Sequence, residues 1–214
     1  MSIFNSRNRI ELLLSLVNEF QPNTFAEIGV WRGDFAAVIL RECPFIRTYL
    51  MIDPWNYLPD WNKPLNISSS EFSEIYRDAI EKTRFASNKI EVLRGRTKDV
   101  VDSILNDSLD FVYIDGDHTL RGITIDLIKI FPKVKSGGYI AGDDFTKSPW
   151  QHTSNFEPTL VCPFAVYFAE AMNVPIAILP HNQFLIRKDS HSGFAIEDAT
   201  GEYNNFDLKS ILFP

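Results

Sequence analysis

The 214-residue sequence is poor in cysteine and has no excess of basic residues, and each shortage excludes a class of protein. Its two cysteines, Cys43 and Cys162, are too few for a disulfide framework or for a zinc site made by cysteines alone. With 21 Lys and Arg against 28 Asp and Glu, the net charge of −7 argues against a nucleic acid or an anionic membrane surface as the main partner. No apolar run has the length of a membrane span, so we expect a cytoplasmic protein that does not enter a membrane.

The longest apolar run near the N-terminus, residues 12–17, belongs to a helix and not to a signal peptide. Glu11 and Glu19 flank it, no small-residue cleavage site follows it, and its apolar residues recur at helical spacing. We therefore predict an amphipathic helix over Arg7–Phe20 that ends before Pro22.

Short β-rich runs alternate with helical stretches along the rest of the chain. The predicted strands are Thr24–Val30, Thr48–Asp53, Lys89–Gly95, Leu109–Asp115, Gly138–Asp144, Pro175–Leu179 and Gln183–Arg187. The predicted helices between them are Gly33–Arg41, Ser70–Arg84, Lys98–Leu105, Thr119–Phe131 and Pro163–Met172. Alternation of this kind, with nearly continuous apolar strands, predicts a doubly wound parallel sheet with helices on both faces.

The last two predicted strands are separated only by residues 180–182. A parallel crossover needs about a dozen residues, so these two strands must be antiparallel. The sequence thus predicts one α/β domain over residues 1–214, with a seven-stranded sheet whose last strand is reversed. We expect an N-terminal helix in residues 1–22, the core in 23–188, and an apolar tail in 189–214 that docks on the body or on a second copy in a homodimer.

Two long segments without periodicity, Pro54–Ser69 and Phe145–Thr159, follow predicted strands. Ligands bind in open α/β sheets at the carboxyl ends of strands, and loops of this length in a compact domain tend to be functional or disordered. Trp55, Tyr57, Trp61 and Trp150 within them are predicted to form walls of a ligand pocket.

The first predicted strand carries Glu27 and is followed by Gly29 and Gly33. Gly29 would let the backbone turn sharply and approach a ligand, although a plain tight turn fits the two glycines equally well. Asp53 ends the second strand, about 20 residues further on, where a carboxylate can accept both ribose hydroxyls of a nucleoside. A turn aspartate before Pro54 is the alternative for that residue. Together these features favour a nucleoside-containing ligand.

Four carboxylates and one imidazole follow the fourth and fifth predicted strands: Asp115, Asp117, His118, Asp143 and Asp144. Asp115 and Asp143 are 28 positions apart, the length of one helix and one strand, which returns the chain to the same edge of the sheet. Burying like charges together is costly, and hard oxygen ligands in this number suit Mg²⁺ or another divalent cation. Any single aspartate fits a cap or turn as well, but the set favours metal binding.

The glycine pattern lacks the close second glycine of the dinucleotide-binding fingerprint, because Trp31 stands there, and this disfavours NAD. Glu27-x-Gly29-x-x-x-Gly33 instead resembles the first motif of class I S-adenosylmethionine-dependent methyltransferases, whose Rossmann-like sheet also ends in a reversed strand. The resemblance implies that S-adenosylmethionine is bound by Glu27, Gly29, Gly33, Asp53, Thr97 and Asp115.

The IDGDH segment at 114–118 and the GDD segment at 142–144 resemble metal-dependent small-molecule O-methyltransferases. That group includes macrolide-sugar and aminocoumarin-sugar enzymes and, more distantly, catechol O-methyltransferase, and the resemblance covers roughly residues 23–187. It implies a divalent cation on Asp115, Asp143 and Asp144, with Asp117 as the general base. His118 stands where the sugar enzymes usually have an apolar residue, and it is the second candidate for the base.

We therefore predict methyl transfer from S-adenosylmethionine to a hydroxyl of a small-molecule acceptor, a sugar or a catechol-like diol, whose deprotonation the cation favours. The alternative is a metal-dependent glycosyltransferase that uses Asp115-Gly116-Asp117 as its Asp-x-Asp motif for a nucleotide sugar. That reading leaves the glycine loop and Asp53 without a role. A non-catalytic binding module is disfavoured because every expected acidic position is filled.

Overall fold

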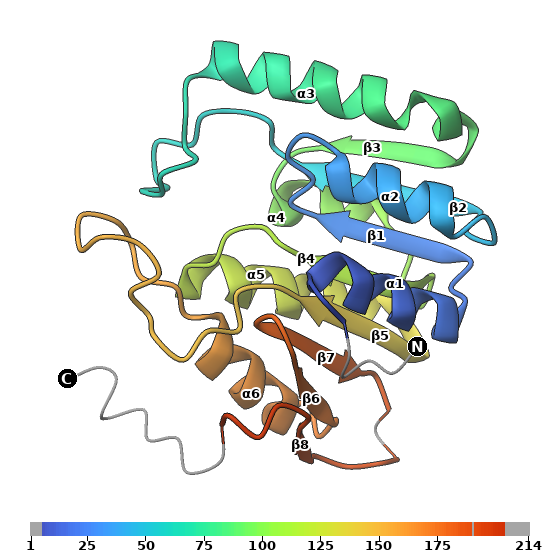
Figure 1. Ribbon diagram of the computed structural model, residues 1–214, viewed down its shortest axis with the longest axis vertical. Helices are drawn as coiled ribbons and strands as arrows, with labels where there is room; N and C mark the ends of the chain where they lie inside the picture. Colours follow the sequence, from blue (N-terminus) through green and yellow to red (C-terminus); the bar gives the residue numbers. More distant parts are fainter. Residues whose placement is uncertain (1–5, 190, 204–214) are drawn as a thin grey trace.

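The computed structural model of the protein describes residues 6–189 and 191–203. One eight-stranded sheet runs through the molecule in the order β3-β2-β1-β4-β5-β7-β6-β8 (Figure 1). β7 is antiparallel to both of its neighbours, and every other neighbouring pair is parallel. The strands are β1 (Thr24–Ile28), β2 (Thr48–Asp53), β3 (Ile90–Arg94), β4 (Leu109–Ile114), β5 (Val134–Gly142), β6 (Ile176–Leu179), β7 (Gln183–Arg187) and β8 (Ile196–Asp198).

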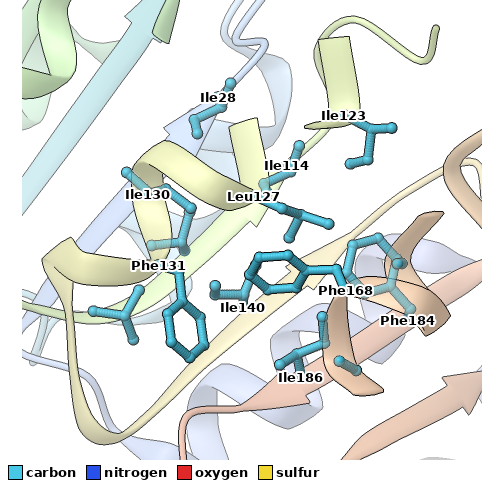
Figure 2. Close-up of a cluster of buried hydrophobic side chains, with 14 of the residues drawn as sticks. Ile28, Ile114, Ile123, Leu127, Ile130, Phe131, Ile140, Phe168, Phe184 and Ile186 are labelled. Atoms are coloured by element: carbon cyan, nitrogen blue, oxygen red, sulfur yellow. The ribbon is translucent and has the colours of Figure 1, made fainter. Parts of the chain in front are cut away.

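Helices cover both faces of the sheet because side chains alternate along each strand. One apolar cluster joins Phe25 and other odd-numbered strand residues to α1 (Arg9–Phe20), α2 (Asp34–Glu42) and α3 (Ser69–Thr83). The other, drawn in Figure 2, packs α5 (Leu120–Ile130) and α6 (Val161–Ala171) against the opposite face. The short α4 (Thr97–Val100) follows β3, and the described residues also form the 3₁₀ helices η2 (Arg84–Lys89), η3 (Val101–Ser103) and η4 (Phe131–Lys133).

Polar caps fix where the helices near the strand ends begin. Ser68 and Glu71 form a reciprocal capping box at the start of α3, which ends the first long loop. Thr119 accepts a hydrogen bond from the Gly122 backbone and so starts α5 directly after the IDGDH segment. The chain therefore enters both helices from segments that lie at the carboxyl edge of the sheet.

The structure confirms the predicted α/β sheet with helices on both faces and a reversed strand near its end. The predicted strand count of seven was wrong, because Ile196–Asp198 in the tail forms β8 and pairs with β6. This strand is three residues long and Ile196 is exposed, so it lacks the buried alternation from which a strand is predicted. The tail thus docks on the body through β8, whereas its later apolar residues, from Phe206 onward, lie outside the described residues.

The predicted helix over Lys98–Leu105 was too long, because the chain forms the short α4 and continues as η3. None of the helices within the described ranges combines the length and the apolarity that a membrane crossing requires.

Candidate active site

A cavity of about 540 Å³ lies at the carboxyl ends of the central strands. This volume is within the roughly 300–1,000 Å³ of small-molecule pockets. Residues from the ends of β1, β2, β3, β4 and β5 line it, together with both long loops and with Arg9 of α1. The two loops project from the same end of the sheet (Figure 1), and Asn62 of the first donates hydrogen bonds to Asn155 and Glu157 of the second.

Gly29 lines the cavity and holds two strand ends together. Its φ is +90°, and a Cβ there would lie 2.0 Å from the Asp115 carbonyl oxygen. Since the Asp115 amide donates to the Ile28 carbonyl at 2.7 Å, β1 and β4 are in backbone contact at this point. Only glycine fits both this φ and this approach.

Gly33 does not line the cavity, although the sequence assigned it to the cofactor. It is the N-cap of α2 with a φ of +72°, and a Cβ there would lie 2.9 Å from Cα of Ala79 on α3. The contacts of this glycine therefore serve the packing of α2 against α3.

Asp53 lines the cavity and is held by backbone amides. Its Oδ2 accepts a hydrogen bond from the Trp31 amide at 3.0 Å, and its Oδ1 accepts one from the Trp55 amide at 2.7 Å. Burial raises its pKa to about 6, although these amide bonds act in the opposite direction. A carboxylate has about four lone-pair sites, so these bonds leave room for a ligand hydroxyl, and the residue fits the predicted ribose contact.

Glu27 of β1 is not among the residues that line the cavity. It is fully buried and accepts a hydrogen bond from the Tyr49 hydroxyl at 2.6 Å. Burial raises its pKa well above the ordinary value, and the charges of Asp115 and Asp53 add to the shift. The structure therefore does not bring Glu27 to the cavity wall, in contrast to the sequence-based assignment.

Thr97 lines the cavity at the start of α4 and hydrogen bonds to Asp126, a residue that sequence reasoning missed. Asp126 lies on α5, also lines the cavity, and has its pKa raised to about 7 by complete burial. A carboxylate on the apolar stripe formed by Ile123, Leu127 and Ile130 was the available signal. We call Gly29, Asp53, Thr97 and Asp126 the cofactor half of the cavity.

Asp115, His118 and Asp144 form the most compact group on the other side of the cavity. Each offers a ligand atom, and these atoms lie within 4.8 Å of one another. His118 Nδ1 pairs with Oδ2 of Asp144, and the Gln151 side chain donates a hydrogen bond to Oδ1 of the same carboxylate. Together with Asp117 and Asp143, these three residues make up the acidic half of the cavity.

Asp143 is turned toward other partners. Its Oδ2 accepts from Arg9 Nη1, which also donates to Asp115 Oδ2 at 2.9 Å. Its Oδ1 accepts from the Gln183 side chain and from the Asp144 amide. The guanidinium of Arg9 thus lies between two of the three carboxylates predicted to bind a cation.

The two candidate bases differ in environment. Asp117 Oδ1 accepts hydrogen bonds from Trp61 Nε1 and from the Thr119 amide, both at 3.0 Å. Burial lowers the pKa of His118 to about 3, and the nearby charges of Lys63, His152 and Arg9 act in the same direction. A neutral imidazole that donates from Nδ1 to Asp144 leaves its Nε2 lone pair for a ligand.

The aromatic residues of the long loops have separate places. Trp61 lines the cavity, as predicted, and so does Trp31 of the glycine loop. Trp55 is instead fully buried and donates from Nε1 to the Trp31 carbonyl, while Trp150 is 51% exposed. Tyr57 is 47% exposed and does not line this cavity either, so three of the four predicted wall residues lie elsewhere.

Three comparisons relate this geometry to known proteins. A family model described as a methyltransferase domain matches residues 26–145, more than half of the chain. An uncharacterized protein of Acanthamoeba polyphaga mimivirus is 25% identical over 144 residues, which are 65% of this chain and 60% of that protein. The chain therefore spans less than two thirds of the length of this relative.

Two solved structures share the fold at low sequence identity. The S-adenosylhomocysteine-bound methyltransferase of Podospora anserina is 15% identical, with a TM-score of 0.58 over 86% of this chain and 80% of that one. The O-methyltransferase TomG of Streptomyces achromogenes, which is involved in tomaymycin synthesis and was solved with S-adenosylmethionine, is also 15% identical. Its TM-score is 0.57 over 84% of this chain and 78% of its own.

Proposed function

The chain belongs to the methyltransferase domain family, and we propose that it transfers a methyl group from S-adenosylmethionine to a hydroxyl of a small molecule. One observation carries this proposal: a single cavity holds both a half suited to a nucleoside and a half suited to deprotonating a hydroxyl. The two neighbouring structures that contain S-adenosylmethionine or its demethylated product support the choice of cofactor.

In this proposal the cofactor half binds the adenosine. Asp53 accepts the ribose hydroxyls with the lone pairs that its amide bonds leave, and Thr97 with Asp126 lies at the adenine. Gly29 allows the cofactor to approach the backbone between β1 and β4. When bound, S-adenosylmethionine supplies a methyl group on a positively charged sulfur.

The acidic half fits a divalent cation, since two carboxylates and an imidazole already converge there. Asp115, Asp143 and Asp144 are the proposed ligands, and His118 lies close enough to add a nitrogen. Arg9 would have to release Asp143 for this set to close. A bound cation would lower the pKa of an acceptor hydroxyl and fix its position, which suits a diol that offers two oxygens.

Asp117 is the proposed general base. Both of its hydrogen bonds, from Trp61 and from the Thr119 backbone, go to Oδ1 and orient the carboxylate, so we assign Oδ2 to the acceptor proton. Asp117 would take the proton as the acceptor oxygen receives the methyl group that a bound S-adenosylmethionine would supply, with the carbon–sulfur electron pair left on S-adenosylhomocysteine. His118, neutral and oriented by Asp144, is the second candidate.

The glycosyltransferase alternative gains no support, because the matching family model describes a methyltransferase domain over both the glycine loop and the IDGDH and GDD segments.

The test is methyl transfer to diols by the purified protein, followed by mass spectrometry. S-adenosylmethionine is mixed with catechol or its carboxylated form protocatechuate, in Mg²⁺ or in EDTA. We expect wild type in Mg²⁺ to form a product heavier than the acceptor by one methylene group. This product should not form in EDTA or with the Asp117→Asn variant. Product formation that EDTA leaves unchanged would contradict the proposed need for a divalent cation. Hydrolysis of UDP-sugar without any methylation would contradict the proposed methyl transfer.

A further inference from the structure

Lys63, in the loop between β2 and α3, is a buried lysine in the cavity wall. The residue is 5% exposed and lines the cavity. Its ammonium nitrogen donates to Thr159 Oγ1 at 3.3 Å, a neutral acceptor. In the described part of the chain, no carboxylate oxygen lies within 4.0 Å of this nitrogen.

The arginines that line the cavity are more exposed than Lys63, and each of them has a carboxylate partner. Arg9 pairs with Asp115, Arg96 with Asp60, and Arg121 with Glu157. A buried ammonium without a counter-ion is costly, and the cost falls when an anion binds beside it. Burial accordingly lowers the pKa of Lys63, while the more distant charges of Asp117 and Glu157 oppose the shift.

Lys63 belongs to the acidic half, where the acceptor would bind. Its charge lowers the pKa of His118, and the charge of Asp117 acts to raise the pKa of Lys63, so the lysine lies near both candidate bases. Its partner Thr159 donates to Gln151 at 2.7 Å, and Gln151 in turn donates to Asp144. The ammonium is thus the end of a hydrogen-bonded chain that begins at a proposed metal ligand.

We propose that Lys63 binds an anionic oxygen group of the acceptor, so that the substrates are hydroxylated carboxylates rather than neutral diols. The inference rests on the proposed function, since it names the class of its acceptor. The residues around the lysine supply the remaining requirements: Asp117 faces the hydroxyl, and Lys63 neutralises the charge that an acidic cavity would otherwise repel.

Two other roles for Lys63 have different consequences. As a tie between the loops through Thr159, it would affect every acceptor equally, because its removal would loosen the cavity wall. As a proton acceptor, it would change kcat on every acceptor and leave KM in place. Only an ion pair with the substrate depends on the charge of the substrate.

The experiment compares protocatechuate with its neutral amide, which has the same diol and nearly the same shape. Binding to the protein saturated with S-adenosylhomocysteine and Mg²⁺ is measured by calorimetry, and kcat and KM are measured with S-adenosylmethionine. The variants are Lys63→Met, Lys63→Gln in case the first does not fold, and Lys129→Met, which removes an exposed lysine of α5 as the control.

We expect wild type to prefer protocatechuate to the amide by at least about thirty-fold, the loss typical of a buried charge pair that lacks one partner. Lys63→Met and Lys63→Gln should abolish this preference by weakening the binding of protocatechuate alone, and Lys129→Met should keep it.

A wild type without preference, an equal loss for both acceptors, or a loss confined to kcat would each overturn the inference. Absence of S-adenosylhomocysteine binding in wild type would instead reject the proposed function. Cofactor binding with neither acceptor bound would overturn the inference about the acceptor and leave the cofactor assignment in place.

Discussion

Asp53 in the cofactor half is held by a different kind of donor from Asp143 and Asp144 in the acidic half. In the cofactor half, Asp53 accepts from the backbone amides of Trp31 and Trp55. In the acidic half, side chains do most of this work: Arg9 and Gln183 hold Asp143, and His118 and Gln151 hold Asp144. Backbone donors are fixed by the fold, whereas long side chains can rotate away when a ligand arrives. The cofactor half is therefore preorganised, and the acidic half is adjustable.

The backbone contact under the cofactor half should show the largest effect. Gly29→Ala places a Cβ against the Asp115 carbonyl at a φ of +90°, so we expect a loss of about 3 kcal/mol or more of unfolding free energy and of cofactor binding. Gly137→Ala is the matched control: its φ is +82° but nothing lies within 4 Å, and it should cost only about 1–2 kcal/mol. Urea denaturation measures the unfolding free energy of both variants. Equal losses would mean that the backbone conformation alone matters, and not the contact between β1 and β4.

Asp126 tests the cofactor half without a ligand, because burial raises the pKa of this carboxyl group in the folded protein. Its pKa in the folded protein, about 7, lies above the ordinary 3.8, so its contribution to stability is complete below pH 3.8 and is lost as the pH rises through 7. Asp126→Asn has no such loss. Between about pH 4 and pH 8 the stability difference should shift by about 4 kcal/mol in favour of the variant, at about 1.4 kcal/mol per pKa unit.

Urea denaturation of the ligand-free protein at several pH values provides the test. A difference between wild type and Asp126→Asn that stays constant with pH would show that Asp126 titrates normally in the folded state.

Two substitutions should separate the halves by the ligand that each affects. Asp53→Ala removes the proposed ribose acceptor and leaves two amides unpaired, so the affinity for S-adenosylhomocysteine should fall at least about ten-fold. Asp115→Asn should keep that affinity and lower the affinity for Mn²⁺ by about ten-fold, because one ligand charge is lost. Calorimetry with each ligand measures the pair. A large loss of S-adenosylhomocysteine affinity in Asp115→Asn would place Asp115 at the nucleoside instead.

Substitution of Arg9 should have the smallest effect, and it should strengthen metal binding rather than weaken it. Its guanidinium occupies Asp115 and Asp143, so Arg9→Met should raise the affinity for Mn²⁺ by about three- to ten-fold if the acidic half adjusts as described. Arg7→Met is the control, because Arg7 pairs with Glu11 on the surface of the same helix region. Weaker Mn²⁺ binding in Arg9→Met would show that Arg9 supports the site rather than competes for it.

The sequence predicted the parts of the fold and of the site that depend on local pattern. The apolar strands and the carboxylates that follow them were found because each strand end is contiguous in sequence, and parallel topology brings these ends together. Gly33 was assigned to the cofactor because glycine spacing does not distinguish a ligand contact from the close approach of α2 to Ala79.

The remaining site residues depend on contacts that no local pattern records. Arg9 lies 106 positions from Asp115 and 134 from Asp143, and it is one exposed-looking residue at the start of an amphipathic helix. Lys63 is an ordinary lysine in a polar loop, and only the packed loops show that it is buried. Asp126 could have been found from the sequence, since it interrupts the apolar stripe of a predicted helix.

The central claim is that the cofactor half binds S-adenosylmethionine whatever occupies the acidic half. Calorimetric titration of wild type with S-adenosylhomocysteine, in EDTA and again in Mg²⁺, tests it most directly. We expect micromolar binding of similar affinity in both conditions. No binding in either condition would contradict it.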